Sequence, residues 1–524
     1  MGRLTKFDFN YLALQELKTN EFGTNWPVVY ILENGKEAYV GETTSAVRRM
    51  KNHLENGERK QLKTVNLITD YEFNKSVTLD LESKLIEYIA ADGKYKLQNS
   101  NKGMRNHNYY NRDQYNFRFE EIWNELKSNE LAINSLFDIQ NSDLFKLSPY
   151  KVLTDDQRDI VNEIDKILMQ HTDSVSVIKG EPGSGKTILA IYLAKYFVSH
   201  EQMPLEKVGI VLPMTSLRST VKKVFRNVTG LKSNMVYGPS QVVKADHKFD
   251  LLIVDEAHRL AQRRNLSSYT YFDKINETLG LYGEDSTQLD WIMKSANHVV
   301  LFYDHNQSVK PSDINPNKFQ ALNANWFSLK TQMRVKAGDA YTEYIENILN
   351  NTQSVGIEFE NYDFRLFSDV EEMVSAIKAL ESNYGLCRVV AGYAWEWKTK
   401  KDPTTFDIEI GNYKYRWNSV NEDWINSDNA INEIGCIHTI QGYDLNYAAV
   451  IIGPELIYRD GRIQFVQENY KDRYGKHTSK SGQEIHQYII NIYKTLMSRG
   501  ILGTYVYACD EELRMYLSRF IQMK

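Results

Sequence analysis

The stretch "IKGEPGSGKTILA", from Ile178 to Ala190, constrains the fold of this chain more than any other. The residues that fit G-x-x-x-x-G-K-[ST] and its loop are Gly180, Gly183, Gly185, Lys186 and Thr187. Apolar residues before the loop predict a buried strand, and "TILAIYLAKYF" predicts the following helix. Backbone N–H groups of such a loop surround a phosphate at a helix N-terminus. The sequence therefore predicts an α/β fold that binds ATP, with Lys186 on the β/γ-phosphate oxygens and Thr187 as a ligand of Mg²⁺.

A second strand signal supports the same chemistry. "FDLLIVDEAHRL", Phe249 to Leu260, is an apolar strand that ends in two carboxylates. Asp255 is placed to hold Mg²⁺, directly or through water, and Glu256 to polarise an attacking water.

Length and composition limit the remaining possibilities. The 524 residues predict three or four compact units. A net charge of −5 gives no overall nucleic-acid signature, so such binding must come from local patches. Cys387, Cys436 and Cys509 lie far apart, which suits a reducing compartment and offers neither a disulfide framework nor a zinc cluster. No apolar run is long enough to span a bilayer and the start lacks a signal-peptide core, so we expect a cytoplasmic protein without a membrane partner.

From about Leu153 to the end, the chain resembles a superfamily 1 helicase. The matching segments are "LTDDQRDIV", "VLPMTSLRSTVKKVF", "VLFYDHNQSV", "KTQMRVKAG", "GCIHTIQGYDLNYAAVIIG" and "NIYKTLMSRGILGTYVYA". The wording of "PMTSLR", "DEAHRL", "QMRVKAG" and "HTIQGYDL" is most similar to the P-loop domain of Schlafen-type helicases and related bacterial proteins.

This resemblance implies two RecA-like parallel-sheet lobes, residues 151–330 and 331–524, with insertions near 400–430 and 455–488. It also implies roles for single residues. Gln157 would read the adenine edge. Gln307, in a motif that also contains Asp304, would sense the γ-phosphate. Gln441 would belong to the nucleotide site with Gly442 and Asp444 beside it. Arg334 and Arg499 would cross a cleft to meet charge developing on the γ-phosphoryl group, with Arg499 as the arginine finger.

The insertions mix Lys or Arg with aromatic residues, as in "KTKKDPTTFDIEIGNYKYRWNSVNEDW". This composition is typical of single-strand stacking surfaces, and equally of aromatic side chains that decorate a sheet edge. Asp460-Gly461 in "YRDGRIQF" predicts a tight hairpin.

The first 110 residues have a separate pattern. "VVYIL" and "EAYVG" predict two strands joined through Asn34-Gly35, followed by a helix that begins near Thr43–Ser45. Arg49 and His53 share one face of that helix. Residues 44–63 carry six basic and two acidic residues, a local charge of +4 that suits a phosphodiester.

This arrangement resembles the small mixed α/β domain of GIY-YIG nucleases, over about residues 25–105. Val28-Val29-Tyr30 stands for the first triad and Tyr39-Val40-Gly41 for the second, although the first glycine is absent. The resemblance implies that Glu82 binds Mg²⁺, with Mn²⁺ as the alternative, and that Arg49 binds the transition-state charge. Tyr30, Tyr39 and His53 would position and deprotonate water, and Asn99, or alternatively Asn101, would supply the closing Asn. Residues 111–150 predict a helical connector.

Together the two resemblances imply an ATP-dependent nuclease–helicase that acts on nucleic acid, with DNA favoured over RNA. They also suggest bacterial anti-phage defence, with repair as the competing role and a second copy of the chain or a phage-derived trigger as further partners. Two alternatives stay open: an ATP-gated nucleic-acid sensor that does not unwind, and an RNA-directed nuclease.

Overall fold

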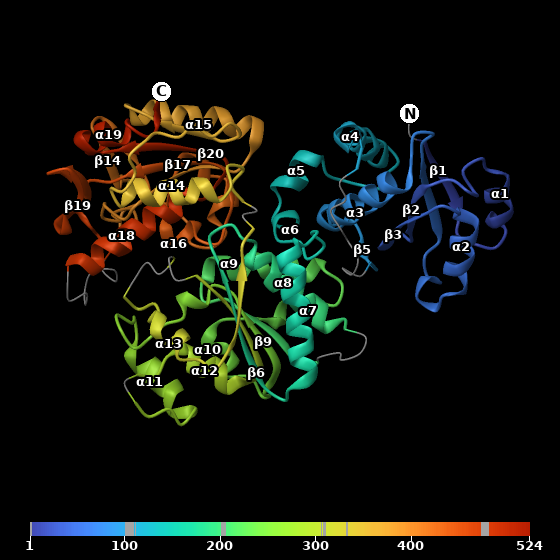
Figure 1. Ribbon diagram of the computed structural model, residues 1–524, viewed down its shortest axis with the longest axis horizontal. Coiled ribbons are helices and arrows are strands. Elements are labelled where there is room, and N and C mark those ends of the chain that lie inside the picture. Colours follow the sequence, from blue (N-terminus) through green and yellow to red (C-terminus); the bar gives the residue numbers. More distant parts are fainter. Residues whose placement is uncertain are drawn as a thin grey trace. The chain divides into compact units, whose positions relative to one another are not determined.

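The computed structural model describes residues 3–99, 109–110, 112–200, 206–283, 285–304, 307, 311–331, 334–472 and 482–524 (Figure 1). These residues form two compact units. The first unit contains Met1–Asp155, Ile191–Pro204 and Val221–Ser233, and the second contains Asp156–Ala190, Leu205–Thr220 and Asn234–Lys524. Asn101, the alternative closing Asn, lies outside the described residues.

The first unit is built on a five-stranded sheet of order β1-β4-β2-β3-β5. Its strands are β1 (Arg3–Asp8), β2 (Val28–Glu33), β3 (Glu37–Thr43), β4 (Thr64–Thr69) and β5 (Lys96–Leu97). The predicted hairpin is confirmed: β2 and β3 pair antiparallel, and Gly35 takes the left-handed conformation at φ 84° that the turn requires. Neighbouring helices are α1 (Ala13–Thr19), α2 (Ala46–Glu55) and α3 (Lys75–Asp92).

The helix of the basic segment begins at Ala46, close to the expected position, but Ser45 makes no side-chain cap. Instead the Thr43 hydroxyl accepts the backbone N–H of Ser45 at 3.0 Å, which fixes the entry into α2.

The predicted connector is helical, with α4 (Arg112–Ser128), α5 (Leu136–Asn141) and α6 (Asp143–Lys146). Trp123 of α4 is fully buried, and its ring centroid lies 5.8 Å from that of Tyr88 on α3. Phe145 of α6 packs on the same tyrosine at 4.7 Å. These helices therefore complete the core of the first unit rather than forming an open linker.

The second unit contains two six-stranded sheets in which every pairing is parallel. The first sheet, of lobe 1, has the order β11-β6-β10-β9-β7-β8. Its strands are β6 (Ser174–Gly180), β7 (Val208–Val211), β8 (Val236–Tyr237), β9 (Phe249–Val254), β10 (Ala296–Tyr303) and β11 (Asn325–Leu329). The helical segments along this part of the chain are α7 (Asp155–Gln170), α8 (Lys186–Val198), α9 (Thr215–Asn227), α10 (Pro239–Val242), α11 (Tyr269–Thr278), α12 (Gln288–Ser295) and α13 (Pro316–Gln320), with a short 3₁₀ turn, η3 (Ala257–Arg259).

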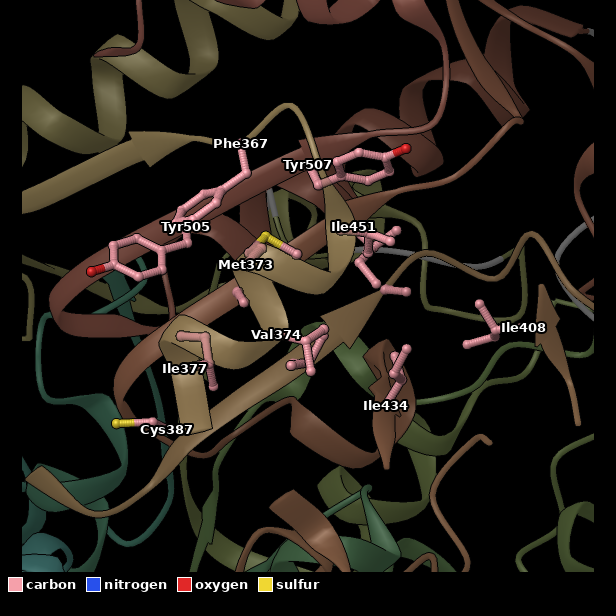
Figure 2. Packing of buried hydrophobic residues seen from close by; sticks show 14 of the residues in the cluster. Phe367, Met373, Val374, Ile377, Cys387, Ile408, Ile434, Ile451, Tyr505 and Tyr507 are labelled. Carbon is pink, nitrogen blue, oxygen red and sulfur yellow. The ribbon is translucent and has the colours of Figure 1, made fainter. Parts of the chain in front are cut away.

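The second sheet, of lobe 2, has the order β16-β13-β17-β20-β12-β21. Its strands are β12 (Asp363–Leu366), β13 (Cys387–Ala391), β16 (Ile434–Cys436), β17 (Leu445–Ile452), β20 (Gly500–Ala508) and β21 (Gln522–Met523). Its helices are α14 (Asp339–Leu349), α15 (Val370–Tyr384), α16 (Ile437–Ile440), α18 (Gly482–Met497) and α19 (Glu511–Leu517). Met373, Val374 and Ile377 of α15 pack into one core with Ile451 and Tyr505 of the sheet (Figure 2). Parallel strands covered by helices, as predicted, make both lobes RecA-like.

The insertions contain two small hairpins, β14 (Ile408–Ile410) with β15 (Tyr413–Tyr415), and β18 (Leu456–Arg459) with β19 (Arg462–Phe465). The Asp460-Gly461 turn is confirmed, since both residues have positive φ, 53° and 75°. Trp417 and Trp424 are 1% and 0% exposed. For these two tryptophans the structure favours a packing role over an open stacking surface.

Candidate active sites

The phosphate-binding loop lies between β6 and α8, and α8 begins at Lys186. Gly183 and Gly185 have φ of 91° and 78°, which non-glycine residues rarely adopt. The Lys186 ammonium donates to the carbonyls of Gly180 at 2.6 Å and Glu181 at 2.9 Å. The loop therefore has the backbone geometry and the buried cation that the sequence predicts for a phosphate cradle.

Sheet order brings the acidic residues to this loop. Since β10 lies between β6 and β9, the residues that follow these three strands meet at one edge of the sheet. The Thr187 hydroxyl donates to Asp255 at 2.7 Å, and Lys186 Nζ lies 3.4 Å from Asp304 Oδ2. Thr187 and Asp255 present neighbouring oxygens, the donor type that Mg²⁺ prefers, so this pair fits the expected metal.

The two carboxylates after β9 differ in their surroundings. Burial, and then the neighbouring Glu256, raise the pKa of Asp255 to about 6. Burial acts on Glu256 in the same direction, but His258, Lys186 and Arg499 outweigh it and hold its pKa well below the usual range. Glu256 is therefore the carboxylate that stays ionised, as a group that polarises water must be.

Arg334 and Arg499 of lobe 2 lie close to the acidic residues of this site. Arg499 immediately precedes β20 and is 1% exposed. It donates to the Tyr443 carbonyl at 3.2 Å and to Gln307 Oε1 at 3.4 Å, while Gln307 Nε2 donates to Asp304 at 2.6 Å. Burial and the nearby Arg334 lower the pKa of Arg499 to about 10, so the guanidinium keeps its charge at neutral pH.

The other residues predicted for the nucleotide site are Arg334, Gln157 and Gln441. Arg334 forms an ion pair with Asp444, next to Tyr443. Gln157 is fully buried and donates to the Ser184 carbonyl of the phosphate loop at 3.2 Å, so its contact with an adenine edge stays a prediction. Both amide atoms of Gln441 are buried without a hydrogen-bond partner among the described residues. A pocket of about 410 Å³ opens beside the loop, lined by Glu181, Ser184, Leu329, Lys330, Thr331, Asp339, Glu343 and Glu346.

In the first unit, four of the predicted nuclease residues form one cluster. The Tyr30 hydroxyl lies 2.7 Å from His53 Nε2 and accepts Arg49 Nε at 3.1 Å. The Tyr39 ring centroid lies 5.1 Å from that of His53 and 6.2 Å from that of Tyr30. Burial raises the pKa of Tyr30, and burial with Arg49 and then Arg59 lowers the pKa of His53 to about 4. Near neutral pH the Tyr30 hydroxyl therefore stays protonated and the His53 imidazole stays neutral.

The other two predicted nuclease residues are Glu82, a carboxyl group with a raised pKa, and Asn99, whose side chain bonds to the backbone of β3. Burial, and then the neighbouring Glu42, raise the pKa of Glu82 to about 7. Asn99 accepts the Val40 N–H at 3.0 Å and donates to the Val40 carbonyl at 2.8 Å, so it extends the pairing of β3. Among the described residues no group of three or more His, Cys, Asp or Glu is arranged to hold a metal.

Sequence reasoning gave no role to two residues that the structure places in these sites. The first is His258, whose Nε2 lies 2.9 Å from Glu256 Oε2. Arg59 lies 4.1 Å over the Tyr39 ring and donates to Gln98 at 2.7 Å. The signal for Arg59 was present only as part of the basic run that follows the α2 residues.

A phosphate loop, an Asp-Glu pair at the same edge of one parallel sheet and an arginine that precedes a strand of a second parallel sheet define the class of RecA-like P-loop proteins. Residues 173–510 match the family described as Schlafen group 3, DNA/RNA helicase domain. The chain belongs to this family, which confirms the Schlafen-type resemblance of its second part.

The chain is 31% identical over 308 residues to an uncharacterized protein of Saccharomyces cerevisiae, YPL245W, covering 52% of this chain and 64% of the yeast protein. It therefore spans less than two thirds of this curated relative. Among solved structures, a Bacteroides Pif1 helicase in complex with ADP-AlF3 and ssDNA is 12% identical, with a TM-score of 0.27 and 68% of this chain and 92% of that chain covered. The Pif1 helicase of Candida albicans is 10% identical, with a TM-score of 0.30 and 70% and 99% covered.

None of the described helices is long and apolar enough to cross a membrane.

Proposed function

We propose that the second unit hydrolyses ATP and uses the energy to move along or unwind nucleic acid. The observation that carries this proposal is the continuous polar chain Lys186–Asp304–Gln307–Arg499, which joins the phosphate loop of lobe 1 to the guanidinium of lobe 2. A charge change at the γ-phosphate would be felt directly by residues of both lobes. Such coupling is what an ATP-driven change of lobe arrangement needs.

Each residue contributes through its charge or hydrogen bonds. Lys186 neutralises β/γ-phosphate oxygens, and Glu256, kept ionised, orients and polarises the attacking water. Mg²⁺, held from Thr187 and Asp255, would neutralise phosphate charge. Arg499 stabilises charge that develops on the transferred phosphoryl group, in a site from which water is largely excluded.

The test is ATP turnover by the purified full chain, with and without single-stranded, duplex and forked DNA or RNA. Lys186→Ala should abolish hydrolysis because the phosphate charge is left uncompensated. Glu256→Gln should still bind ATP and hydrolyse it very slowly. Wild-type turnover in either variant would refute the assignment, and strand-stimulated hydrolysis without duplex displacement would favour the ATP-gated sensor.

We infer that the first unit is a GIY-YIG-type endonuclease. The supporting observation is the convergence of Tyr30, Tyr39, Arg49 and His53, four residues that the family pattern requires, around one buried hydroxyl. Arg49 can stabilise the extra negative charge of a phosphodiester transition state, and the neutral His53 can accept a proton through Tyr30. A divalent metal held by Glu82 would bind the scissile phosphate.

The nuclease assay uses end-labelled DNA and RNA of the same forms with Mg²⁺, Mn²⁺ or a chelator. Metal-dependent cutting that favours DNA supports the proposal, and cutting of RNA alone would support the RNA-directed alternative. Anti-phage defence and repair, and a second copy or a phage-derived trigger as partner, stay predictions from the resemblance.

A further inference from the structure

Glu256 occupies an unusual backbone position. Its φ of 51° lies in the left-handed region, which costs a non-glycine residue conformational energy and persists only where the surroundings enforce it. The turn η3 follows at once, and its middle residue His258 is 0% exposed. His258 Nε2 lies 2.9 Å from Glu256 Oε2. A buried side chain thus meets the carboxylate to which we assign water activation.

The contacts of the ring define which nitrogen carries the proton. The backbone N–H of Asp304 donates to His258 Nδ1 at 3.3 Å. A nitrogen that accepts a hydrogen bond holds no proton, so this contact leaves Nε2 as the nitrogen that carries a proton. That proton faces Glu256. His258 therefore presents a donor to the carboxylate, although the alignment of the pair falls short of a regular hydrogen bond.

The turn that carries His258 is itself fixed. The next residue, Arg259, is buried and donates to Asp313 at 2.6 Å. The backbone N–H of Ile314 donates to the Leu260 carbonyl at 2.8 Å. These contacts tie the segment after β9 to the segment after β10 and hold the backbone of η3, while the hydrogen bond from the Asp304 N–H holds the imidazole ring.

We propose that His258 is a positioning residue for ATP hydrolysis. Its Nε2–H sets the orientation of the Glu256 carboxylate, and its Nδ1 links that orientation to Asp304, whose side chain meets Lys186 and Gln307. Glu256 is thereby coupled to Asp304 and Gln307, the residues that connect to Arg499 of lobe 2. This inference rests on the ATPase proposed above.

Removing one oriented donor to an ionised group should lower the turnover number on the order of 10- to 100-fold. ATP binding depends on the phosphate loop rather than on Glu256, so the KM for ATP should change little. A structural defect would instead lower the amount of folded protein, or alter KM and turnover together.

The experiment measures steady-state ATP hydrolysis by the full chain carrying His258→Leu, His258→Gln or Glu256→Gln, and by the double variant His258→Leu/Glu256→Gln. The glutamine at 258 retains an N–H donor at about the reach of Nε2, so it should restore part of the lost turnover. In the Glu256→Gln background, His258→Leu should cost nothing further, because the group it positions is already inactive. His298→Leu is the matched control, since His298 is a buried histidine of the same sheet that bonds Ser174 at 2.9 Å.

Normal turnover in a folded His258→Leu protein, with Glu256→Gln inactive, would overturn the positioning role and leave the ATPase intact. An additive loss in the double variant, or no rescue by glutamine in a protein with a normal melting temperature, would also overturn it. Normal turnover in Glu256→Gln itself would instead sink the proposed ATPase, so the two failures can be told apart.

Discussion

Replacing Arg499 by alanine tests the inter-lobe chemistry most directly. The guanidinium is buried, donates to the Tyr443 carbonyl and Gln307, and interacts electrostatically with Glu256. None of its described hydrogen bonds is to the phosphate loop itself. Alanine should therefore leave the contacts of Lys186 in place and remove the charge of Arg499 together with its hydrogen bonds to Tyr443 and Gln307.

The expected loss follows from the role of the charge. An arginine that stabilises the transferred phosphoryl group contributes about 10³-fold or more in rate, or about 4 kcal/mol of transition-state stabilisation. The variant also leaves two buried acceptors, Tyr443 O and Gln307 Oε1, without this donor, which should lower the free energy of unfolding by about 1–3 kcal/mol. The rate effect should therefore exceed the stability effect.

The assay is single-turnover hydrolysis of ATP at saturating nucleic acid, with nucleotide affinity measured separately by equilibrium binding. Arg499→Lys is the matched control, because it keeps the charge but loses the planar fork and should recover only part of the rate. Lost nucleotide binding together with normal residual turnover would show that Arg499 is not the finger.

The other predictions concern both units. Glu82→Ala should abolish cutting and leave ATP turnover near that of the wild type. Lys186→Ala should lower cutting of duplex substrates. Equal cutting by wild type and Lys186→Ala with ATP would show that the ATPase of the second unit does not deliver strand to the nuclease of the first. Gly41→Ala places a Cβ 2.2 Å from the Tyr30 hydroxyl, so the ring must move, which should cost about 1–3 kcal/mol of stability and lower cutting at least tenfold, measured with unchanged ATP turnover as the control. Burial raises the pKa of Glu455 to about 7 from 4.5, so the folded state retains a proton that the unfolded state releases, and the free energy of unfolding should fall as pH rises from about 4.5 to 7. Urea denaturation of wild type and Glu455→Gln at several pH values measures this, and an identical pH dependence in both would contradict the assignment.

Local sequence patterns predicted the elements that depend on neighbours in the chain. The phosphate loop needs glycines at fixed offsets between a strand and a helix, and the β2–β3 hairpin needs Asn34-Gly35 at its turn. Both were correct because turn geometry is set by the residues that occupy it. The sequence also predicted which residues share a helix face: Arg49 and His53, four residues apart, both contact Tyr30.

Local sequence patterns could not predict that the tryptophans of the insertions are buried. Trp417 and Trp424 lie in segments rich in charged and polar residues, and the sequence left stacking and packing equally open. In the structure Trp424 donates to Glu433 at 2.8 Å and its ring covers Gly435, where any Cβ would lie 2.3 Å from the indole. This contact depends on how β16 and the insertion fold against each other, so no local sequence pattern predicts that Trp424 covers Gly435.

Local sequence patterns identified the chemical groups of the site and the segments that carry them: the phosphate loop, the Asp255-Glu256 pair and the arginine-bearing segments. The tertiary structure decided which groups meet. Asp304 reaches Lys186, 118 residues earlier, only because β10 inserts between β6 and β9. Arg499 lies beside Asp444 because β17 and β20 pair in parallel, with Leu445 opposite Gly500. Strand order is a property of the whole sheet, set by packing and connection topology rather than by residues near either strand, so no local pattern contains it.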